Sequence, residues 1–357
     1  MTAHLAEACE SLAAQTLRGI AAHPAKIFAG LAIRPGTCYG WLHAGKHVFL
    51  AAGCRGAYRE AIGSECCFML ISNELPKIRT VLETLDGGTR YLEKREIADA
   101  RRNMQWLVAH QLKCKRMDLY VQFDRPLSES DLQPLREALK LRGEGVPLQH
   151  LLGRVSFHHR EFKSDARALI PRPETEELAE WLLGMSFPDD QSLLDMGCGS
   201  GVLGLTLAAE RPAWRVTLAD ISPAALALAQ ENAAALAIPN LHWCESDLFA
   251  AIDGTFDGIV ANLPYVAESE RAELSREVQH DPPLALFSGP DGLDLLKRFI
   301  PEAFERLKPG GWLALEIGHD QASQIGEILR SSGFSEIEIK TDLSGVARFP
   351  FAQRPVL

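Results

Sequence analysis

The chain of 357 residues lacks any run of 18 or more apolar residues, so no membrane-spanning helix is expected. Its first thirty residues scatter Glu7, Glu10, Arg18 and Lys26 among alanines. They lack a basic start followed by an apolar block, so no secretory signal is predicted. Basic residues are in the minority, because 37 Lys and Arg face 47 Asp and Glu and leave a net charge of −10. This balance argues against a large nucleic-acid surface, and we expect a cytoplasmic protein without direct nucleic-acid binding.

Residues 1–68 contain no aspartate and show no sustained helical or strand period. Four side chains in this region are of types that bind metal ions, namely Cys38, His43, His47 and Cys54. Their spacing matches no standard zinc pattern, so no metal site is predicted. We expect residues 1–68 to be an unassigned extension, either disordered or upstream of the true translation start at Met69, where the composition changes.

Residues 69–153 are predicted to form a small all-helical domain. Apolar residues recur at three- and four-residue steps over 75–85 and again over 97–112. The pair Gly87-Gly88 is expected to end the first helix, and Ser128 is expected to cap a third. The segment contains no obvious catalytic cluster, so we predict that it docks a substrate.

Residues 154–170 are predicted to form a β-hairpin bridge, and residues 171–357 an α/β domain. From Ser192 onward strands and helices alternate, which is typical of a parallel sheet covered on both faces. Seven strands are expected, at 192–196, 215–219, 241–244, 257–261, 311–317, 335–340 and 346–350. The expected helices are 201–210, 223–236, 292–307 and 320–332.

A glycine-rich turn follows the first of these strands, in the stretch Asp195-Met196-Gly197-Cys198-Gly199-Ser200-Gly201. Glycines allow a tight turn and a close approach of the backbone to a ligand. The pattern lacks the G-x-x-G step of dinucleotide binders. A sulfonium nucleoside has no pyrophosphate but carries an amino-acid tail, and Asp195 suits the ammonium group of that tail, directly or through water.

Acidic residues also follow the next two strands. Asp220 ends the second strand, where a carboxylate can accept both ribose hydroxyls. Asp247 follows the third strand and can accept from an adenine amino group, while Leu248 can pack on the base. Each Asp alone is as readily a helix cap or turn residue. Together with Asp195 they lie at the carboxyl ends of successive strands, where α/β sheets bind ligands, so the set predicts an S-adenosylmethionine site.

The fourth strand runs into Asn262-Leu263-Pro264-Tyr265. The Asn carboxamide offers two donors and an acceptor, Pro fixes the backbone, and Tyr offers a flat face and a hydroxyl. Such a group could clamp a planar, nitrogen-bearing substrate. The tetrapeptide alone is equally consistent with an ordinary strand exit, in which Asn and Pro are common.

From about residue 72 to 357 the chain resembles the protein N5-glutamine methyltransferases that modify peptide chain release factors. These are class I S-adenosylmethionine-dependent methyltransferases. Apart from the two motifs above, the resemblance rests chiefly on Pro147 to Gly153, Ile170-Pro171-Arg172-Pro173-Glu174-Thr175-Glu176 and Glu316-Ile317-Gly318. It implies a seven-stranded Rossmann-like domain preceded by a small all-α domain. The implied reaction transfers a methyl group to N5 of the Gln in the Gly-Gly-Gln motif of release factors.

The resemblance also implies roles for the residues of the Asn-Leu-Pro-Tyr loop. We expect the Asn262 carboxamide oxygen and the Leu263 carbonyl to accept the two substrate N–H bonds, with Pro264 shaping the loop. Leu263 replaces the Pro that the family usually carries, but it still supplies a carbonyl. Tyr265 is expected to pack against the methionine end of the cofactor or the substrate amide, Asn262 to contact the cofactor as well, and Arg172 to contact the substrate.

Three other functions fit parts of the pattern. Glutamine methylation of a ribosomal protein would use the same chemistry. Asn-Leu-Pro-Tyr also occurs in ribosomal RNA adenine dimethyltransferases, but their cofactor motif lies near the N-terminus, their extra domain follows the catalytic one, and they lack Arg-Pro-Glu-Thr-Glu. A catalytically dead binding module is disfavoured by the intact acidic and glycine positions and by Asn262.

Overall fold

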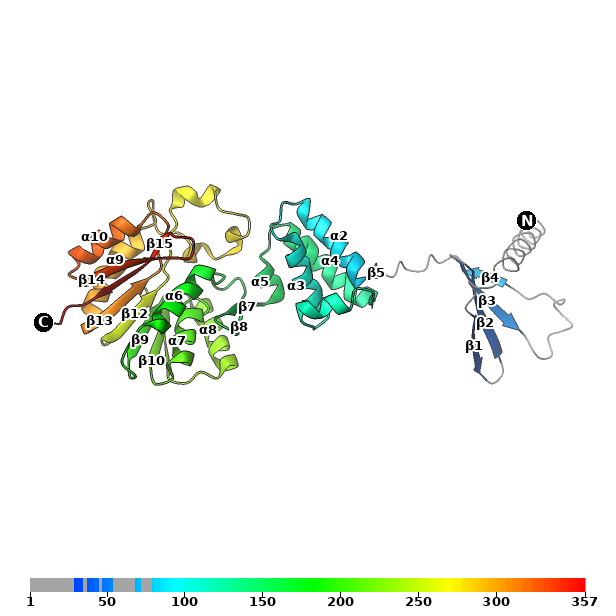
Figure 1. The fold of residues 1–357 in the computed structure, drawn as a ribbon, viewed down its shortest axis with the longest axis horizontal. Helices are drawn as coiled ribbons and strands as arrows, with labels where there is room; N and C mark the ends of the chain where they lie inside the picture. Colours follow the sequence, from blue (N-terminus) through cyan, green and yellow to red (C-terminus); the bar gives the residue numbers. More distant parts are fainter. Residues whose placement is uncertain (1–28, 35–36, 45–46, 54–67, 72–78, 357) are drawn as a thin grey trace. The chain divides into compact units, whose positions relative to one another are not determined.

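The computed structural model describes residues 29–34, 37–44, 47–53, 68–71 and 79–356 (Figure 1). The chain forms two compact units. The first holds the described residues up to Thr80 together with Asp124–Ser128, and the second holds Val81–Phe123 and Glu129–Leu357.

The first unit contains a four-stranded antiparallel sheet. Its strands are β1 (Ala29–Arg34), β2 (Thr37–Ala44), β3 (His47–Gly53) and β4 (Phe68–Ile71), paired in chain order. A separate short pair joins β5 (Arg79–Thr80) to β6 (Pro126–Leu127). The sequence shows no strand period here, so these strands were not anticipated, and Met69 lies within β4. The candidate ligand set Cys38, His43, His47 and Cys54 lies outside the residues whose side chains the structure describes.

The second unit begins with a helical segment. Its elements are α2 (Val81–Glu93), α3 (Ala100–Gln111), the 3₁₀ helix η2 (Arg116–Val121), α4 (Glu129–Gly143) and α5 (Leu148–Leu152). Leu85 and Leu92 of α2 are buried together with Leu107 of α3 and Leu135 of α4. Leu85 and Leu107 belong to the apolar spacing predicted over 75–85 and 97–112, whereas Leu92 lies beyond the predicted end of the first helix.

The prediction that Gly87-Gly88 ends the first helix is wrong, because α2 continues to Glu93. A Cβ atom on Gly88 would lie 2.2 Å from the Met104 sulfur of α3. The missing side chain therefore lets the two helices approach each other. Packing against α3 outweighs the helix propensity that glycine lacks, which is about 1 kcal/mol relative to alanine.

A buried arginine joins α4 to the segment between β12 (Phe256–Ala261) and α9 (Asp294–Arg306). The side chain of Arg142 is only 3% exposed and pairs with Glu277. Its Nε donates to Asn103 Oδ1 at 2.7 Å, and another guanidinium nitrogen donates to the Val146 carbonyl at 3.3 Å. The guanidinium thus satisfies partners from three parts of the same compact unit.

A β-hairpin follows the helical segment, formed by β7 (Arg154–Phe157) and β8 (Arg160–Lys163). Helix α6 (Pro173–Gly184) comes next, with Arg172 at its N-cap and Pro173 in its first turn. Proline suits that turn because its missing N–H would have no partner there. The Arg-Pro-Glu-Thr-Glu block therefore forms the start of a helix.

The remaining chain forms a seven-stranded mixed sheet with the order β11-β10-β9-β12-β13-β15-β14. The strands are β9 (Ser192–Met196), β10 (Arg215–Asp220), β11 (Leu241–Glu245), β12 (Phe256–Ala261), β13 (Leu307–Leu315), β14 (Ser335–Thr341) and β15 (Ala347–Gln353). The sheet is parallel except at one edge. A short turn folds β15 back antiparallel to β14, and β15 inserts between β14 and β13.

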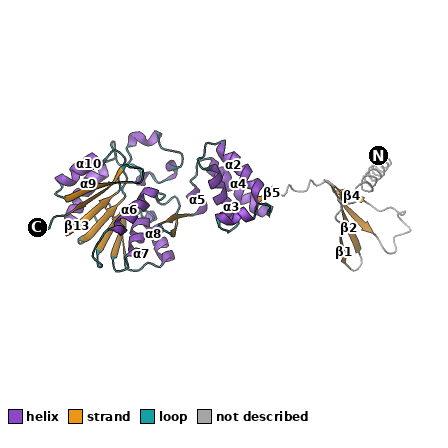
Figure 2. Cartoon of the chain, in the orientation of Figure 1, coloured by secondary structure: helices purple, strands orange, loops and turns teal. Residues whose placement is uncertain are grey.

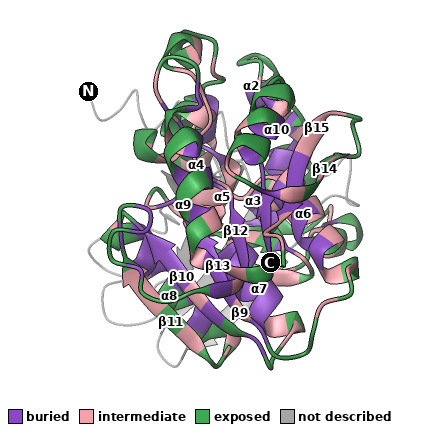
Figure 3. Ribbon diagram, turned by 90° about the vertical axis from the view of Figure 1, so that its left-hand side faces the viewer, coloured by how far each residue is buried: buried purple, intermediate pink, exposed green. Residues whose placement is uncertain are grey.

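Helices cover both faces of this sheet (Figure 2). They are α7 (Val202–Glu210), α8 (Pro223–Leu236), α9 (Asp294–Arg306) and α10 (Ala322–Ser331). Alternate strand residues point to two separate cores: Leu193 and Val260 pack with α6, α7 and α8, whereas Leu194 and Ile259 pack with α9 and α10. The inner strands β10, β9, β12, β13 and β15 are accordingly mostly buried, whereas the edge strands β11 and β14 and the outer helix faces are partly exposed (Figure 3). The α/β fold class predicted from the sequence is confirmed.

Candidate functional site

A cavity of about 400 Å³ opens where the carboxyl ends of β9, β10, β11 and β12 meet. Its walls come from the turns after these strands, from residues 167–171, from residues 282–288 and from the start of α9. The lining includes most of the expected site residues: Asp195, Gly197, Cys198, Gly199, Ser200, Asp220, Asp247, Leu248, Asn262, Leu263 and Pro264. Strand ends thus bring together groups from distant parts of the sequence.

The glycine-rich turn needs glycine for two different reasons. Gly197, Gly199 and Gly201 all have positive φ, at 69°, 57° and 82°. A Cβ atom on Gly197 would lie 2.7 Å from the Leu263 side chain, so this glycine makes room for the Asn-Leu-Pro-Tyr loop. Gly201 does not line the cavity. Its own Cβ would lie 2.9 Å from Leu205, so it serves the packing of α7.

Asp195 lies at the floor of the cavity and is 2% exposed. One carboxylate oxygen accepts a hydrogen bond from the Gly204 backbone N–H at 2.8 Å. Burial raises the pKa of this carboxyl to about 7. A cation bound in the cavity would favour the ionised form, so the site suits an ammonium group.

Asp220 shapes the turn that it faces. Its two oxygens accept from the Gly199 N–H at 2.9 Å and from the Ser222 N–H at 2.8 Å. Burial raises its pKa, and these backbone donors oppose that shift. Each carboxylate oxygen can accept more than one hydrogen bond, so capacity remains for hydroxyl donors in the cavity.

Asp247 and Leu248 differ in exposure. The Asp247 side chain is half exposed and pairs with Arg298 of α9 at 3.3 Å. Leu248 is 5% exposed and has a positive φ of 48°, which turns the loop across the cavity. An apolar side chain therefore stands beside a polar rim, as a bound aromatic base with an amino group requires.

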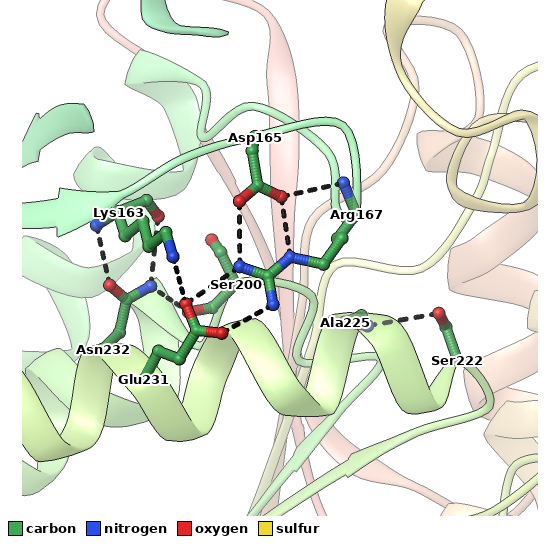
Figure 4. Close-up of polar contacts among 8 residues, drawn as sticks. All are labelled: Lys163, Asp165, Arg167, Ser200, Ser222, Ala225, Glu231 and Asn232. Atoms are coloured by element: carbon green, nitrogen blue, oxygen red, sulfur yellow. Dashed lines mark hydrogen bonds and ion pairs between the residues drawn. The ribbon is translucent and has the colours of Figure 1, made fainter. Parts of the chain in front are cut away.

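Residues 163–168, of which Arg167 and Ala168 line the cavity as part of its wall, are tied to α8 by polar contacts (Figure 4). Asn232 is 1% exposed. Its oxygen accepts from the Lys163 N–H at 2.7 Å, and its nitrogen donates to the carbonyls of Lys163 and Ser200 at 3.2 and 2.9 Å. One carboxamide therefore links the hairpin, α8 and the glycine-rich turn.

A charged cluster completes this wall (Figure 4). The Arg167 guanidinium donates to Asp165 and to Glu231 of α8, with each contact at 2.8–2.9 Å. Hydrogen bonds from Arg167 hold the pKa of both carboxyls below the usual range. With four of its N–H bonds engaged, Arg167 acts as a fixed part of the wall.

The register in which β12 pairs with β13 determines the position of Asn262. β12 pairs with β13 so that Ala261 faces Leu315, and the next residues, Asn262 and Glu316, lie side by side. Asn262 Nδ2 donates to Thr175 Oγ1 at 3.0 Å. Within the described residues, no hydrogen bond reaches the Asn262 side-chain oxygen or the Leu263 carbonyl. Two acceptors are therefore available where β12 enters the cavity.

Glu316 connects the other members of this group. It is 1% exposed. One oxygen accepts from Thr175 Oγ1 at 2.7 Å, and the other accepts from the Tyr265 hydroxyl at 3.3 Å. Burial raises its pKa to about 7, whereas the hydrogen bonds and the charge of Arg348 act in the opposite direction. Sequence reasoning assigned no role to Thr175 or Glu316, although Glu316 follows a buried apolar strand directly.

Tyr265 and Arg172 lie outside the cavity lining that the described residues form. The Tyr265 hydroxyl faces Glu316, and burial raises its pKa so that it stays a donor. Arg172 pairs with the buried Asp281 at 2.6 Å, and Asp281 also accepts from the Ile170 N–H at 3.1 Å. In this structure both side chains support the loops around the cavity.

The described residues contain neither a cluster of side chains that could hold a metal ion nor a helix long and apolar enough to cross a membrane.

Comparison with known proteins agrees with this geometry. Residues 178–289 match the methyltransferase small domain, and residues 83–153 match the PrmC N-terminal domain. A crystal structure of the ribosomal protein L11 methylase from Lactobacillus delbrueckii subsp. bulgaricus overlaps with a TM-score of 0.39 and 24% identity, over 52% of this chain and 80% of that one. That overlap is too small to bear on function. The fold and the matched domains define the chain as a methyltransferase.

Two curated relatives narrow the class. A release factor glutamine methyltransferase of Koribacter versatilis is 37% identical over 77% of this chain and 99% of its own length. One of Deinococcus radiodurans is 42% identical over 61% of this chain and 78% of its own length. The chain belongs to the release factor glutamine methyltransferase family.

Proposed function

We propose that this enzyme transfers a methyl group from S-adenosylmethionine to N5 of the Gln in the Gly-Gly-Gln motif of peptide chain release factors. The observation that carries the proposal is the pair of available acceptors, Asn262 Oδ1 and the Leu263 carbonyl, beside a cavity lined by three strand-end carboxylates. The family to which the chain belongs supplies the substrate.

The cavity fits S-adenosylmethionine in three respects. Asp195 is buried and would gain a counter-ion from the ammonium of the methionine tail. Asp220 keeps capacity for ribose hydroxyls, and Leu248 lies next to Asp247 where an adenine would place its face and amino group. Gly199 leaves the backbone open to close approach, because a Cβ there would have only Ala168 within 4 Å, at 3.9 Å. When bound, the cofactor supplies an electrophilic methyl group on a positively charged sulfur.

The chain's own residues act mainly by positioning. An amide nitrogen is a poor nucleophile because its lone pair is delocalised into the carbonyl. Asn262 Oδ1 and the Leu263 carbonyl accept the two N–H bonds of the substrate amide, which aims the nitrogen and resists its flattening. One of these two protons leaves to solvent when the nitrogen is methylated, so that the product is a neutral secondary amide. Holding reactants at roughly 3–3.5 Å in line can lower a barrier by about 7–11 kcal/mol in favourable cases.

The test incubates the full chain and labelled S-adenosylmethionine separately with a release factor, ribosomal proteins and ribosomal RNA. Label on the release factor is expected, and it should disappear when the Gln of the tripeptide is replaced by Ala. Label only on a ribosomal protein would agree with glutamine methylation but would contradict the release factor as the substrate. Label on RNA adenine would overturn both and make Asn-Leu-Pro-Tyr the decisive motif.

A further inference from the structure

Asn262 can face the substrate in two ways, because rotating its carboxamide by 180° exchanges the oxygen and the nitrogen. The two orientations have nearly the same shape, and the terminal torsion of Asn is broad. Only one of them presents an acceptor to a substrate N–H. Something must select that orientation.

The hydrogen bonds behind Asn262 make this selection. The Thr175 hydroxyl has a single hydrogen. An ionised Glu316 can only accept, and its oxygen lies 2.7 Å from Thr175 Oγ1, so this hydrogen points to Glu316. Thr175 is then left with lone pairs toward Asn262, 3.0 Å away, and only the NH₂ side of the carboxamide can bond to them. As long as Glu316 is ionised, the Asn262 oxygen therefore faces the cavity.

We propose that Thr175 and Glu316 are positioning residues that hold the Asn262 carboxamide oxygen toward the reacting nitrogen. The inference rests on the proposed function for its catalytic meaning, but the orientation itself is a property of the free enzyme. Tyr265 supports the arrangement by donating to the second oxygen of Glu316. Neither Thr175 nor Glu316 needs to touch the substrate.

The chain offers matched variants for a test. Thr175→Val keeps the shape and removes the hydroxyl, whereas Thr175→Ser keeps the hydroxyl. Thr206 of α7 provides the control, because it is fully buried and its hydroxyl has no hydrogen-bond partner among the described residues. Thr206→Val therefore removes a buried hydroxyl without touching the group around Asn262.

The first measurement observes the carboxamide directly and needs no substrate. The sequence contains five asparagines, Asn73, Asn103, Asn232, Asn240 and Asn262, so selective ¹⁵N-Asn labelling yields five side-chain NH₂ signals. The Asn262 signal is assigned as the one lost in Asn262→Asp. Thr175→Val should shift it and raise its solvent-exchange rate by about tenfold or more as the hydrogen bond is lost. Thr175→Ser and Thr206→Val should leave that rate nearly unchanged.

The second measurement follows methyl transfer to the release factor. Thr175→Val should lower kcat by about tenfold or more while KM for S-adenosylmethionine changes by less than about twofold. Thr175→Ser should recover most of kcat, and Thr206→Val should match the wild type. A general loss of folding would instead lower kcat and cofactor binding together in both valine variants.

The two measurements separate the two proposals. An unchanged Asn262 signal in Thr175→Val overturns the positioning role, whatever the kinetics show. A changed Asn262 signal with an unchanged kcat would show that Thr175 orients Asn262 but that this orientation does not contribute to catalysis. If the wild type transfers no methyl group to the release factor, the proposed function fails, and the NMR arm still decides the orientation of Asn262.

Discussion

At the scale of single residues, Asn262 directly follows strand β12 and lines the cavity. Under the proposed function, its oxygen and the neighbouring Leu263 carbonyl accept the N–H bonds of the substrate amide. Asn262→Ala should lower kcat by about 100-fold, comparable to the loss of one preorganised hydrogen-bonding group in other enzymes. The Kd for S-adenosylmethionine, measured by calorimetry, should change by less than about threefold. An equal loss in cofactor binding would contradict the role and make Asn262 a cofactor contact.

At the scale of helices, Gly87 and Gly88 of α2 are adjacent glycines with different surroundings, so the same substitution at each should have opposite effects on stability. Nothing lies within 4 Å of a Cβ on Gly87, so Gly87→Ala should raise the free energy of unfolding by about 0.5–1 kcal/mol through helix propensity. A Cβ on Gly88 would clash with Met104, so Gly88→Ala should lower the free energy of unfolding by about 1–3 kcal/mol through overpacking. Urea unfolding of the two variants checks the signs. Two stabilised variants would mean that α2 and α3 can move apart without cost.

At the scale of the whole molecule, buried carboxyls link folding to pH. Burial raises the pKa of Glu316 from an ordinary value near 4.5 to about 7, in surroundings formed by Thr175, Glu174, Tyr265 and Arg348. Between these values the folded state holds a proton that the unfolded state has lost. The contribution of Glu316 to stability is therefore present below about pH 4.5 and declines as the pH rises through 7.

Glu316→Gln should remove this decline. The stability of the wild type minus that of the variant should fall by about 1.4 kcal/mol per pH unit between pH 4.5 and 7 and become constant above it. Urea unfolding followed by tryptophan fluorescence measures the profile. Glu268→Gln, which replaces an exposed carboxyl paired with Arg271, is the control for the exchange of a carboxyl for a carboxamide at the surface. Parallel profiles for wild type and Glu316→Gln would contradict the raised pKa.

Activity should have the opposite pH dependence for the same reason. A protonated Glu316 can donate to Thr175, which frees the Thr175 hydrogen and ends the selection of one Asn262 orientation. The ionised form that weakens folding above pH 7 is thus the form that orders the site.

The local sequence pattern was sufficient to predict those features that depend only on residues close together in the chain. Buried apolar runs ending in Asp220 or in Asn262 predicted strand ends, and the sheet places both at one edge. The prediction of a methyltransferase is confirmed. The continuation of α2 through Gly88 was mispredicted, because it depends on packing against α3, which follows later in the chain. The direction of β15 was not predicted, because it depends on pairing with β13 and β14.

The sequence by itself determined the alternating strands and helices, the glycine-rich turn and the set of polar side chains at the strand ends. These follow from periodicity and from the conformations that glycine and proline allow. Only the tertiary structure decided which side chains support the site. Thr175 lies 87 residues from Asn262 and 141 from Glu316, and the three meet because β12 pairs with β13 and α6 begins beside their ends. A hydrogen-bond chain over such separations depends on register and packing, which no local pattern specifies.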